Sequence, residues 1–127
     1  MLIDWTDEFN TWLDRLDVAA QDDPISARRR DYIDAQLTRL QELTEAPTDD
    51  TATLKRVRQS RNNLVWRLSH PYDPDIAVRL IVWFPDDNHA VIALFATDKA
   101  RMGDVFYNSV GTRADAVIDK WSKEDRS

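Results

Sequence analysis

The sequence predicts an α+β domain in which two N-terminal helices pack on a mainly antiparallel sheet of three or four strands and a C-terminal helix closes the fold. Three observations support this prediction. Apolar residues recur at helical spacing in the first third of the chain, they alternate with polar residues between about residues 54 and 97, and helical spacing returns over residues 104–121. Because 127 residues suffice for one core, we expect residues 1–127 to form a single domain.

The first third is expected to form two amphipathic helices. Apolar residues at spacings of one, three and four indicate the first: Trp5, Phe9, Trp12, Leu13 and Leu16. Either Asp4 or Thr6 is placed to cap it. The second helix is predicted to begin at Pro24 with Asp23 as its cap. Its apolar stripe contains Ile33, Leu37, Leu40 and Leu43, and the bases Arg28, Arg29 and Arg30 are expected on its solvated face.

The polar segment 44–53 separates these helices from the predicted strands. "NNLVWRLSH" (62–70) alternates apolar and polar residues, and "IAVRLIVWF" (76–84) is apolar enough to be a central strand. Pro85 begins a turn that makes residues 89–97 the return strand of a hairpin. "LKRV" (54–57) is a candidate for a further short strand. Together these segments predict a compact antiparallel sheet.

Residues that build common catalytic sites are scarce. The only glycines are Gly103 and Gly111, so no glycine-rich phosphate loop can be written. The only histidines, His70 and His89, lie 19 residues apart, cysteine is absent, and no serine lies in a G-x-S-x-G elbow. We therefore expect no cofactor and no metal. Because the start is acidic and no apolar run approaches the roughly 18 to 20 residues that span a bilayer, we expect a cytoplasmic protein without membrane association.

Charge is divided unevenly along the chain. The formal net charge is −6, which argues against a general affinity for nucleic acid. Residues 1–53 hold 13 acids and 5 bases, whereas residues 54–127 hold 10 acids and 12 bases. Within the second half, residues 54–70 contain five bases and no acid: Lys55, Arg56, Arg58, Arg61 and Arg67. This segment is the basic patch that indicates a binding surface.

Arg79 interrupts the most apolar predicted strand, where a charge needs a partner or a wet face. One explanation is structural: an ion pair, or a stem that lies on Trp83 with its head in water. The other is a functional arginine. Arg67 points away from the apolar face of its own strand, so both arginines would lie on one sheet face if the two strands are neighbours. Two arginines on one face would attract an anion.

The segment "FATDKARMGDVFY" (95–107) carries Lys99, Arg101 and Tyr107 from the last strand into the C-terminal helix. If that strand lies beside the strand of Arg79, these side chains can converge over the same face. Guanidinium groups donate bidentate hydrogen bonds to phosphate oxygens, and a tyrosine can stack on a base or exchange a proton. The alternative is that Lys99 and Arg101 are ordinary solvated loop residues.

Taken in order, these segments resemble the RelE/HigB toxin superfamily of bacterial type II toxin–antitoxin systems, particularly its phage-derived HigB-like branch. The resemblance covers nearly the whole chain and rests on "FNTWLDRL", "LTRLQEL", "LKRV", "LVWRLSH", "VRLIVWF", "VIALFATDKAR" and the closing helix. These motifs are short, so their order and spacing carry the resemblance. It implies two N-terminal helices against a curved antiparallel sheet, with a C-terminal helix.

The resemblance implies a ribosome-dependent endoribonuclease that cuts mRNA without a metal. The 2′-hydroxyl attacks the adjacent phosphate, and cationic side chains stabilise the charge that develops. The family's catalytic positions fall on Arg67, Arg79, Arg101 and Tyr107, with Tyr107 as proton acceptor or stacking platform. The expected substrate-binding residues are Lys55, Arg56, Arg58, His70 and Lys99. The expected partners are the ribosome, mRNA and a cognate antitoxin, itself a small helix-turn-helix protein.

His70 has two interpretations: an acid or base, as in some HigB-like toxins, or a turn residue before Pro71. Two features depart from the family, whose members are usually strongly basic: the net charge, and the segment "PYDPD" (71–75), which lengthens a loop. The acidic charge favours an alternative, a non-enzymatic module of the same fold such as a ParE-like gyrase inhibitor or a degenerate antitoxin-binding protein. A small enzyme acting on a phosphorylated metabolite is a third alternative, which would need a deep pocket.

Overall fold

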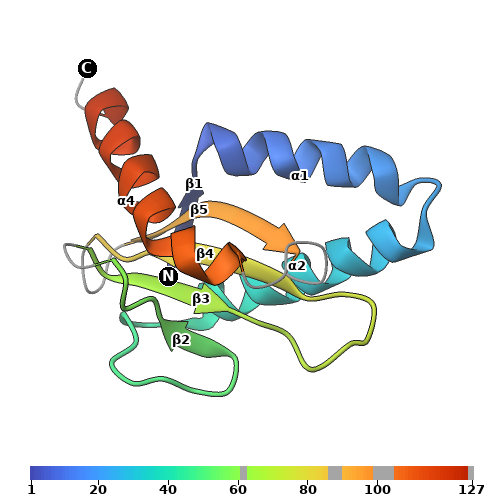
Figure 1. The fold of residues 1–127 in the computed structure, drawn as a ribbon, viewed down its shortest axis with the longest axis horizontal. Coiled ribbons are helices and arrows are strands. Elements are labelled where there is room, and N and C mark those ends of the chain that lie inside the picture. Colours follow the sequence, from blue (N-terminus) through green and yellow to red (C-terminus); the bar gives the residue numbers. More distant parts are fainter. Residues whose placement is uncertain (61–62, 86–89, 99–104, 126–127) are drawn as a thin grey trace.

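The computed structural model describes residues 1–60, 63–85, 90–98 and 105–125, except the side chains of residues 105–109 and 125. Three helices and a five-stranded sheet form the described part (Figure 1). The helices are α1 (Asp7–Ala20), α2 (Pro24–Glu42) and α4 (Val105–Asp125). The strands are β1 (Leu2–Trp5), β2 (Leu54–Arg56), β3 (Val65–Leu68), β4 (Val78–Trp83) and β5 (Ala90–Asp98). None of the described helices combines the length and the apolarity needed to cross a bilayer.

The strands follow the order β1-β5-β4-β3-β2 across the sheet. The pairs from β2 to β5 are antiparallel, whereas β1 runs parallel to β5 at one edge. The α+β class, the two N-terminal helices and the C-terminal helix are confirmed, but the expectation of three or four strands is wrong. The missing strand is β1, whose four residues are too few to show a period. Trp5, which the spacing places in the first helix, belongs to this strand.

The helix caps follow from short polar side chains. The Oγ1 atom of Thr6 accepts the N–H of Phe9 at 3.1 Å and donates to the carbonyl of Leu94 at 2.6 Å, so Thr6 caps α1 and ties it to β5. Asp23 caps α2, and its carboxylate accepts the hydroxyl of Ser26 at 2.7 Å and the N–H of Ile25 at 3.1 Å. These two bonds, the Ser26 bond first, lower the pKa of Asp23.

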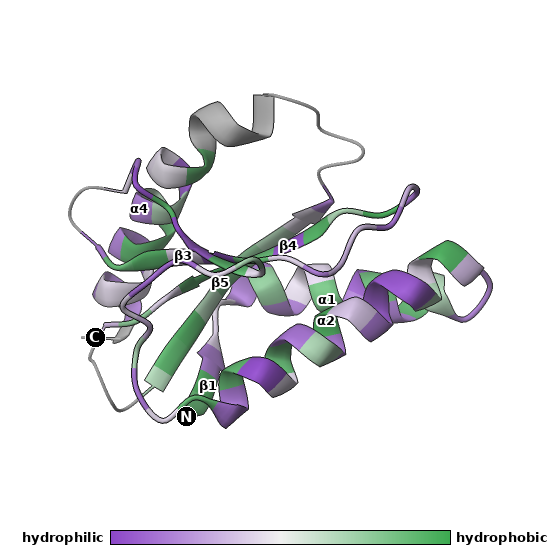
Figure 2. Ribbon diagram, turned by 90° about the horizontal axis from the view of Figure 1, so that it is seen from below, coloured by the Kyte–Doolittle hydropathy of each residue, from purple (hydrophilic) through white to green (hydrophobic). Residues whose placement is uncertain are grey.

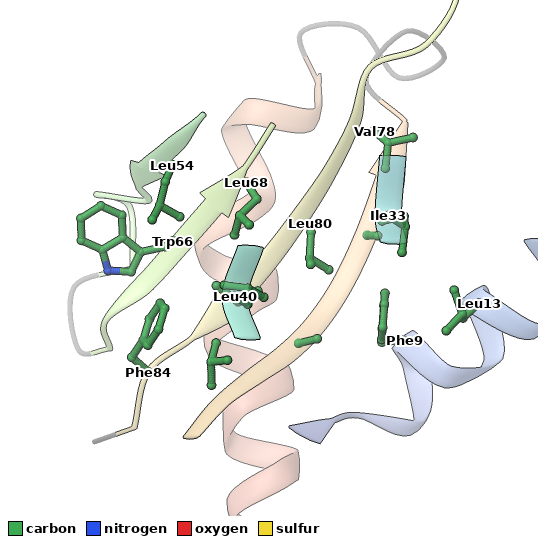
Figure 3. Packing of buried hydrophobic residues seen from close by; sticks show 14 of the residues in the cluster. Phe9, Leu13, Ile33, Leu40, Leu54, Trp66, Leu68, Val78, Leu80 and Phe84 are labelled. Atoms are coloured by element: carbon green, nitrogen blue, oxygen red, sulfur yellow. The ribbon is translucent and has the colours of Figure 1, made fainter. Parts of the chain in front are cut away.

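The two faces of the sheet are covered by different helices, with α1 and α2 on one side and α4 on the other (Figure 2). The α1–α2 face is mostly apolar and supplies the larger core cluster (Figure 3). Its largest members are Phe9, Ile33, Leu40, Trp66, Leu68, Leu80 and Phe84. Because side chains alternate along a strand, Ile81 points to the opposite face and packs with α4. The expectation that residues 76–84 supply a central strand is confirmed, since β4 lies in the middle of the sheet.

Arg29 corrects the expectation that all three bases of α2 near residue 30 are solvated. Its side chain is 9% exposed, and its Nε atom lies 2.7 Å from Oδ2 of Asp98 at the end of β5. The other oxygen of Asp98 accepts the N–H of Ala77 at 3.0 Å. A buried charge needs a partner of this kind, and the sequence shows neither the partner nor the burial. This pair joins α2 to the C-terminal end of β5.

Helix α4 approaches the segment after β2 at Gly111. A Cβ atom placed there would lie 2.4 Å from Cβ of Gln59 and 2.8 Å from the backbone nitrogen of Ser60. One turn further along the helix, Asp115 accepts the hydroxyl of Ser60 at 2.5 Å and the side-chain amide of Asn63 at 2.9 Å. Glycine at position 111 thus lets α4 lie against the connection between β2 and β3.

Candidate functional site

Three bases from neighbouring strands lie on the α4 face of the sheet: Lys55 of β2, Arg67 of β3 and Arg79 of β4. Lys55 is paired directly with Arg67, and Arg67 is paired with Ile81, two residues from Arg79 on the same face. We call these three residues the cationic row. Directly opposite residues have Cβ atoms about 5 Å apart, and diagonal neighbours about 7 to 8 Å. The strand registers thus confirm that Arg67 and Arg79 share a face.

A hollow of about 230 Å³ lies at the Lys55 end of the row. Four of the eight residues that line it are bases: Lys55, Arg56, Arg58 and Arg67. The others are Asp50, Val57, Gln59 and Val110 of α4. We call it the β2 hollow. A concave surface with this excess of positive charge raises the local concentration of anions.

Arg56 and Arg58 make hydrogen bonds within the protein. The guanidinium of Arg56 donates to the carbonyl of Val57 at 2.9 Å and to that of Asn63 at 3.0 Å, so it supports the connection between β2 and β3. Arg58 is exposed and donates to Oδ2 of Asp50 at 3.2 Å. The structure therefore gives Arg56 a structural contact in addition to its place in the β2 hollow.

Asp50 supplies the one acidic side chain of the β2 hollow. Its Oδ1 atom accepts the N–H of Arg56 at 2.9 Å, and its Oδ2 atom faces Arg58. The hydrogen bond from the Arg56 N–H is the largest cause that lowers the pKa of Asp50, and the charges of Arg58 and Lys55 act in the same direction. Asp50 therefore stays ionised at neutral pH and acts as an internal counterion beside the row.

A second hollow, of about 360 Å³, lies at the other end of the row, beneath the loop of residues 69–77. Its lining includes Arg79 together with His70, Tyr72 and Ile76. We call it the loop hollow. The loop extends beyond the ends of β3 and β4 (Figure 1). The cationic row therefore runs across the sheet from one hollow to the other.

His70 is held by the loop itself. Its ring stacks on Tyr32 of α2 with 3.8 Å between ring centroids, and its Nε2 atom accepts the N–H of Val78 at 3.0 Å. An accepting Nε2 requires the proton on Nδ1, which then donates to the carbonyl of Pro71 at 2.7 Å. Both ring nitrogens are thus engaged, and the geometry favours the interpretation of His70 as a turn residue.

Three predicted site residues fall wholly or partly outside the described residues. Lys99 and Arg101 lie outside them, and so does the side chain of Tyr107. The backbone of Tyr107 belongs to α4, three positions before Val110. The chain leaves β5 at Asp98, which is paired with Val78 at the end of the sheet that carries the loop hollow.

Tyr72 and Asp50 are site residues that the sequence did not single out. Both lie in polar connecting segments, and only the structure shows that they line hollows with the bases of the row. Among the residues that the structure describes, no group of three or more His, Cys, Asp or Glu side chains is arranged to hold a metal. Comparison of the chain with protein-family models, curated proteins and solved structures finds no match.

Proposed function

We propose that this chain is a RelE/HigB-like toxin of a type II toxin–antitoxin system, an endoribonuclease that cleaves mRNA on the ribosome in the cytoplasm. The order of two helices, an antiparallel sheet and a closing helix supports the proposal. The observation that carries it is the cationic row. Like charges directly opposite each other destabilise a sheet, yet an acidic protein places Lys55 opposite Arg67 and Arg79 beside them. Phosphate groups are the ligands that such a row of bases suits.

In the proposed reaction, the 2′-oxygen of one nucleotide forms a bond to the adjacent phosphorus while the bond from phosphorus to the 5′-oxygen breaks. The proton of the 2′-hydroxyl passes to a base, and the 5′-oxygen gains a proton as it leaves. Negative charge grows on the non-bridging oxygens of the phosphate. Arg67 and Arg79 suit that charge because guanidinium groups remain protonated and donate two parallel hydrogen bonds. We assign the proton acceptor to Tyr107, and further charge stabilisation to Arg101.

The substrate path in this proposal follows the row. Lys55 and Arg58 in the β2 hollow hold the RNA backbone on one side of the cleaved phosphate, which itself lies against Arg67 and Arg79. Lys99 extends the positive surface. The cognate antitoxin, proposed to be a small helix-turn-helix protein, keeps the toxin inactive.

The proposal is tested by expressing the chain without an antitoxin. Wild-type protein should arrest growth, and Arg79→Ala should relieve the arrest because the loss of one charge-stabilising group lowers cleavage about 100- to 1,000-fold. Lys123→Ala is the matched control, since it removes the same charge from the exposed last turn of α4. Soluble wild-type protein that leaves growth unchanged would overturn the proposal.

A second candidate function is a non-enzymatic module that only binds a partner. The overall charge of −6 and the contact between Arg58 and Asp50 favour it, because both reduce the electrostatic attraction between the protein and RNA. Mapping of mRNA ends in translating extracts separates the two candidates. The toxin should produce new ends that disappear with Arg79→Ala, whereas a gyrase inhibitor or a scaffold leaves transcripts intact.

A further inference from the structure

Tyr72 is the most exposed of the large apolar side chains in the described part of the chain, at 91%. It lies in the loop of residues 69–77 and lines the loop hollow together with Arg79. A single exposed aromatic side chain is common on protein surfaces and by itself indicates nothing. Two further features of its surroundings make Tyr72 significant. The loop that carries it is held by hydrogen bonds and ring stacking, and the hollow that it lines also contains Arg79 of the cationic row.

The loop is fixed on both sides of Tyr72. On one side, His70 stacks on Tyr32 and accepts the N–H of Val78. On the other side, the carboxylate of Asp73 accepts three hydrogen bonds: from the Asp75 N–H at 2.9 Å, the Tyr32 hydroxyl at 2.7 Å and the Arg28 guanidinium at 2.6 Å. These bonds hold the pKa of Asp73 well below its usual range, the Asp75 bond being the largest cause. The loop therefore presents Tyr72 from a position anchored to α2.

The loop hollow combines chemical groups that suit one nucleotide. The residues that line it include the exposed aromatic Tyr72, the basic Arg79 and the apolar Ile76. Proteins bind single-stranded RNA by stacking its unpaired nucleobases on aromatic rings, while Lys and Arg side chains hold the phosphates. A volume of about 360 Å³ leaves room for a single base.

We propose that Tyr72 is a stacking platform for one unpaired base of the RNA, whose phosphate lies against Arg79 in the loop hollow. This inference rests on the proposed function and adds a base-binding position at the end of the cationic row. It also gives a role to the segment 71–75, which lengthens the loop: the extra residues carry an aromatic ring to the edge of the site. Because every base has a face that can stack, the position tolerates different sequences and favours single strands over duplexes.

The test is equilibrium binding of a short fluorescein-labelled 2′-O-methyl oligouridylate at low salt, since this RNA cannot be cleaved through its 2′-oxygen. Tyr72→Ala should weaken binding roughly ten-fold, about 1.4 kcal/mol. Tyr72→Phe and Tyr72→Trp should bind as the wild type does, because both keep an aromatic face. The dependence of binding on salt should be unchanged in Tyr72→Ala, since no charge is lost. Val18→Ala on α1 is the matched control for loss of an exposed apolar side chain.

The reverse test removes the nucleobases from the RNA instead of the ring from the protein. An oligonucleotide with abasic positions should bind wild-type protein and Tyr72→Ala equally weakly. If Tyr72→Ala binds as the wild type does while Arg67→Ala binds more weakly, the inference is wrong and the proposed function stands. Loss of binding in Tyr72→Phe would also overturn it, because the hydroxyl rather than the ring would then carry the contact. If the wild type binds no RNA even at low salt, the proposed function fails and the inference fails with it.

Discussion

The two faces of the sheet differ in the side chains that the same strands place on them. On the α1–α2 face, Leu80 is fully buried in the larger core cluster, and the buried charge of Arg29 is matched by Asp98. On the α4 face, the adjacent residue Arg79 is half-buried at the edge of a hollow, and Arg67 lies diagonally beside it. The comparison shows that one face of the sheet holds the larger core cluster, whereas part of the other face carries charge, which the proposed function uses to bind RNA.

Arg29→Met should have the largest effect on stability. It leaves the Asp98 carboxylate in a buried position without its guanidinium, which costs about 3 to 5 kcal/mol. Unfolding by urea measures the loss. Arg39→Met, on the exposed side of the same helix, should change the free energy of unfolding by no more than about 0.5 kcal/mol. Similar losses for the two variants would mean that the Arg29–Asp98 pair contributes nothing.

Leu80→Ala and Arg79→Ala compare the two faces at neighbouring positions of β4. Leu80→Ala should lower the free energy of unfolding by about 2 to 5 kcal/mol, because it opens a cavity in the larger core cluster. Arg79→Ala should cost clearly less stability and lose RNA cleavage instead. The outcome that would contradict the separation of roles is an Arg79→Ala protein as unstable as Leu80→Ala.

Gly111→Ala should push α4 away from the segment after β2. The new methyl group would meet backbone atoms of Gln59 and Ser60, which cannot move aside cheaply, so we expect a loss of about 1 to 3 kcal/mol despite the better helix propensity of alanine. Thermal unfolding gives the measurement. Thr112→Ala, at an exposed position next in the helix, should be neutral or slightly stabilising. A stabilised Gly111→Ala protein would show that the close approach is absent in solution.

Asp73→Asn should reveal a dependence on pH. The pKa of Asp73 is lowered in the folded protein, first by the Asp75 N–H and then by Tyr32 and Arg28. Its contribution to stability is therefore present above the unfolded pKa of about 4 and is lost as the pH falls below that value. The melting temperatures of wild type and Asp73→Asn should differ most above pH 5 and converge in acid. A difference that stays constant with pH would argue against this carboxylate as the anchor of the loop.

Asp50→Asn should have the smallest effect, and it should strengthen RNA binding rather than weaken it. It removes the internal counterion of the β2 hollow, so RNA should bind roughly two- to five-fold more tightly at low salt, with the gain shrinking at high salt. Asp49→Asn is the control, because it removes the same charge one residue away from the hydrogen bonds to Arg56 and Arg58. Equal gains for both variants would point to net charge rather than to the β2 hollow.

Much of this arrangement could be predicted from the sequence because strand alternation is a local property. The alternation placed Arg67 on the side of its strand away from the apolar set and Arg79 on the side of its strand that also carries Ile81, and the registers then set both on one face. Pairings between distant segments could not be predicted in the same way. Arg29 meets Asp98 across 69 residues, and the place of Asp50 depends on how the connector folds back on β2. The short parallel strand β1 left no periodic signal.

The central claim is that the cationic row binds the RNA backbone, and the salt dependence of RNA binding tests it most directly. The affinity of the 2′-O-methyl oligouridylate should be measured from low to moderate salt for the wild type and for a variant that combines Lys55→Gln, Arg67→Gln and Arg79→Gln. If each base contacts one phosphate, the slope of log affinity against log salt should become shallower by about 2, at roughly 0.7 per phosphate on a single strand. A slope identical to that of the wild type would contradict the account.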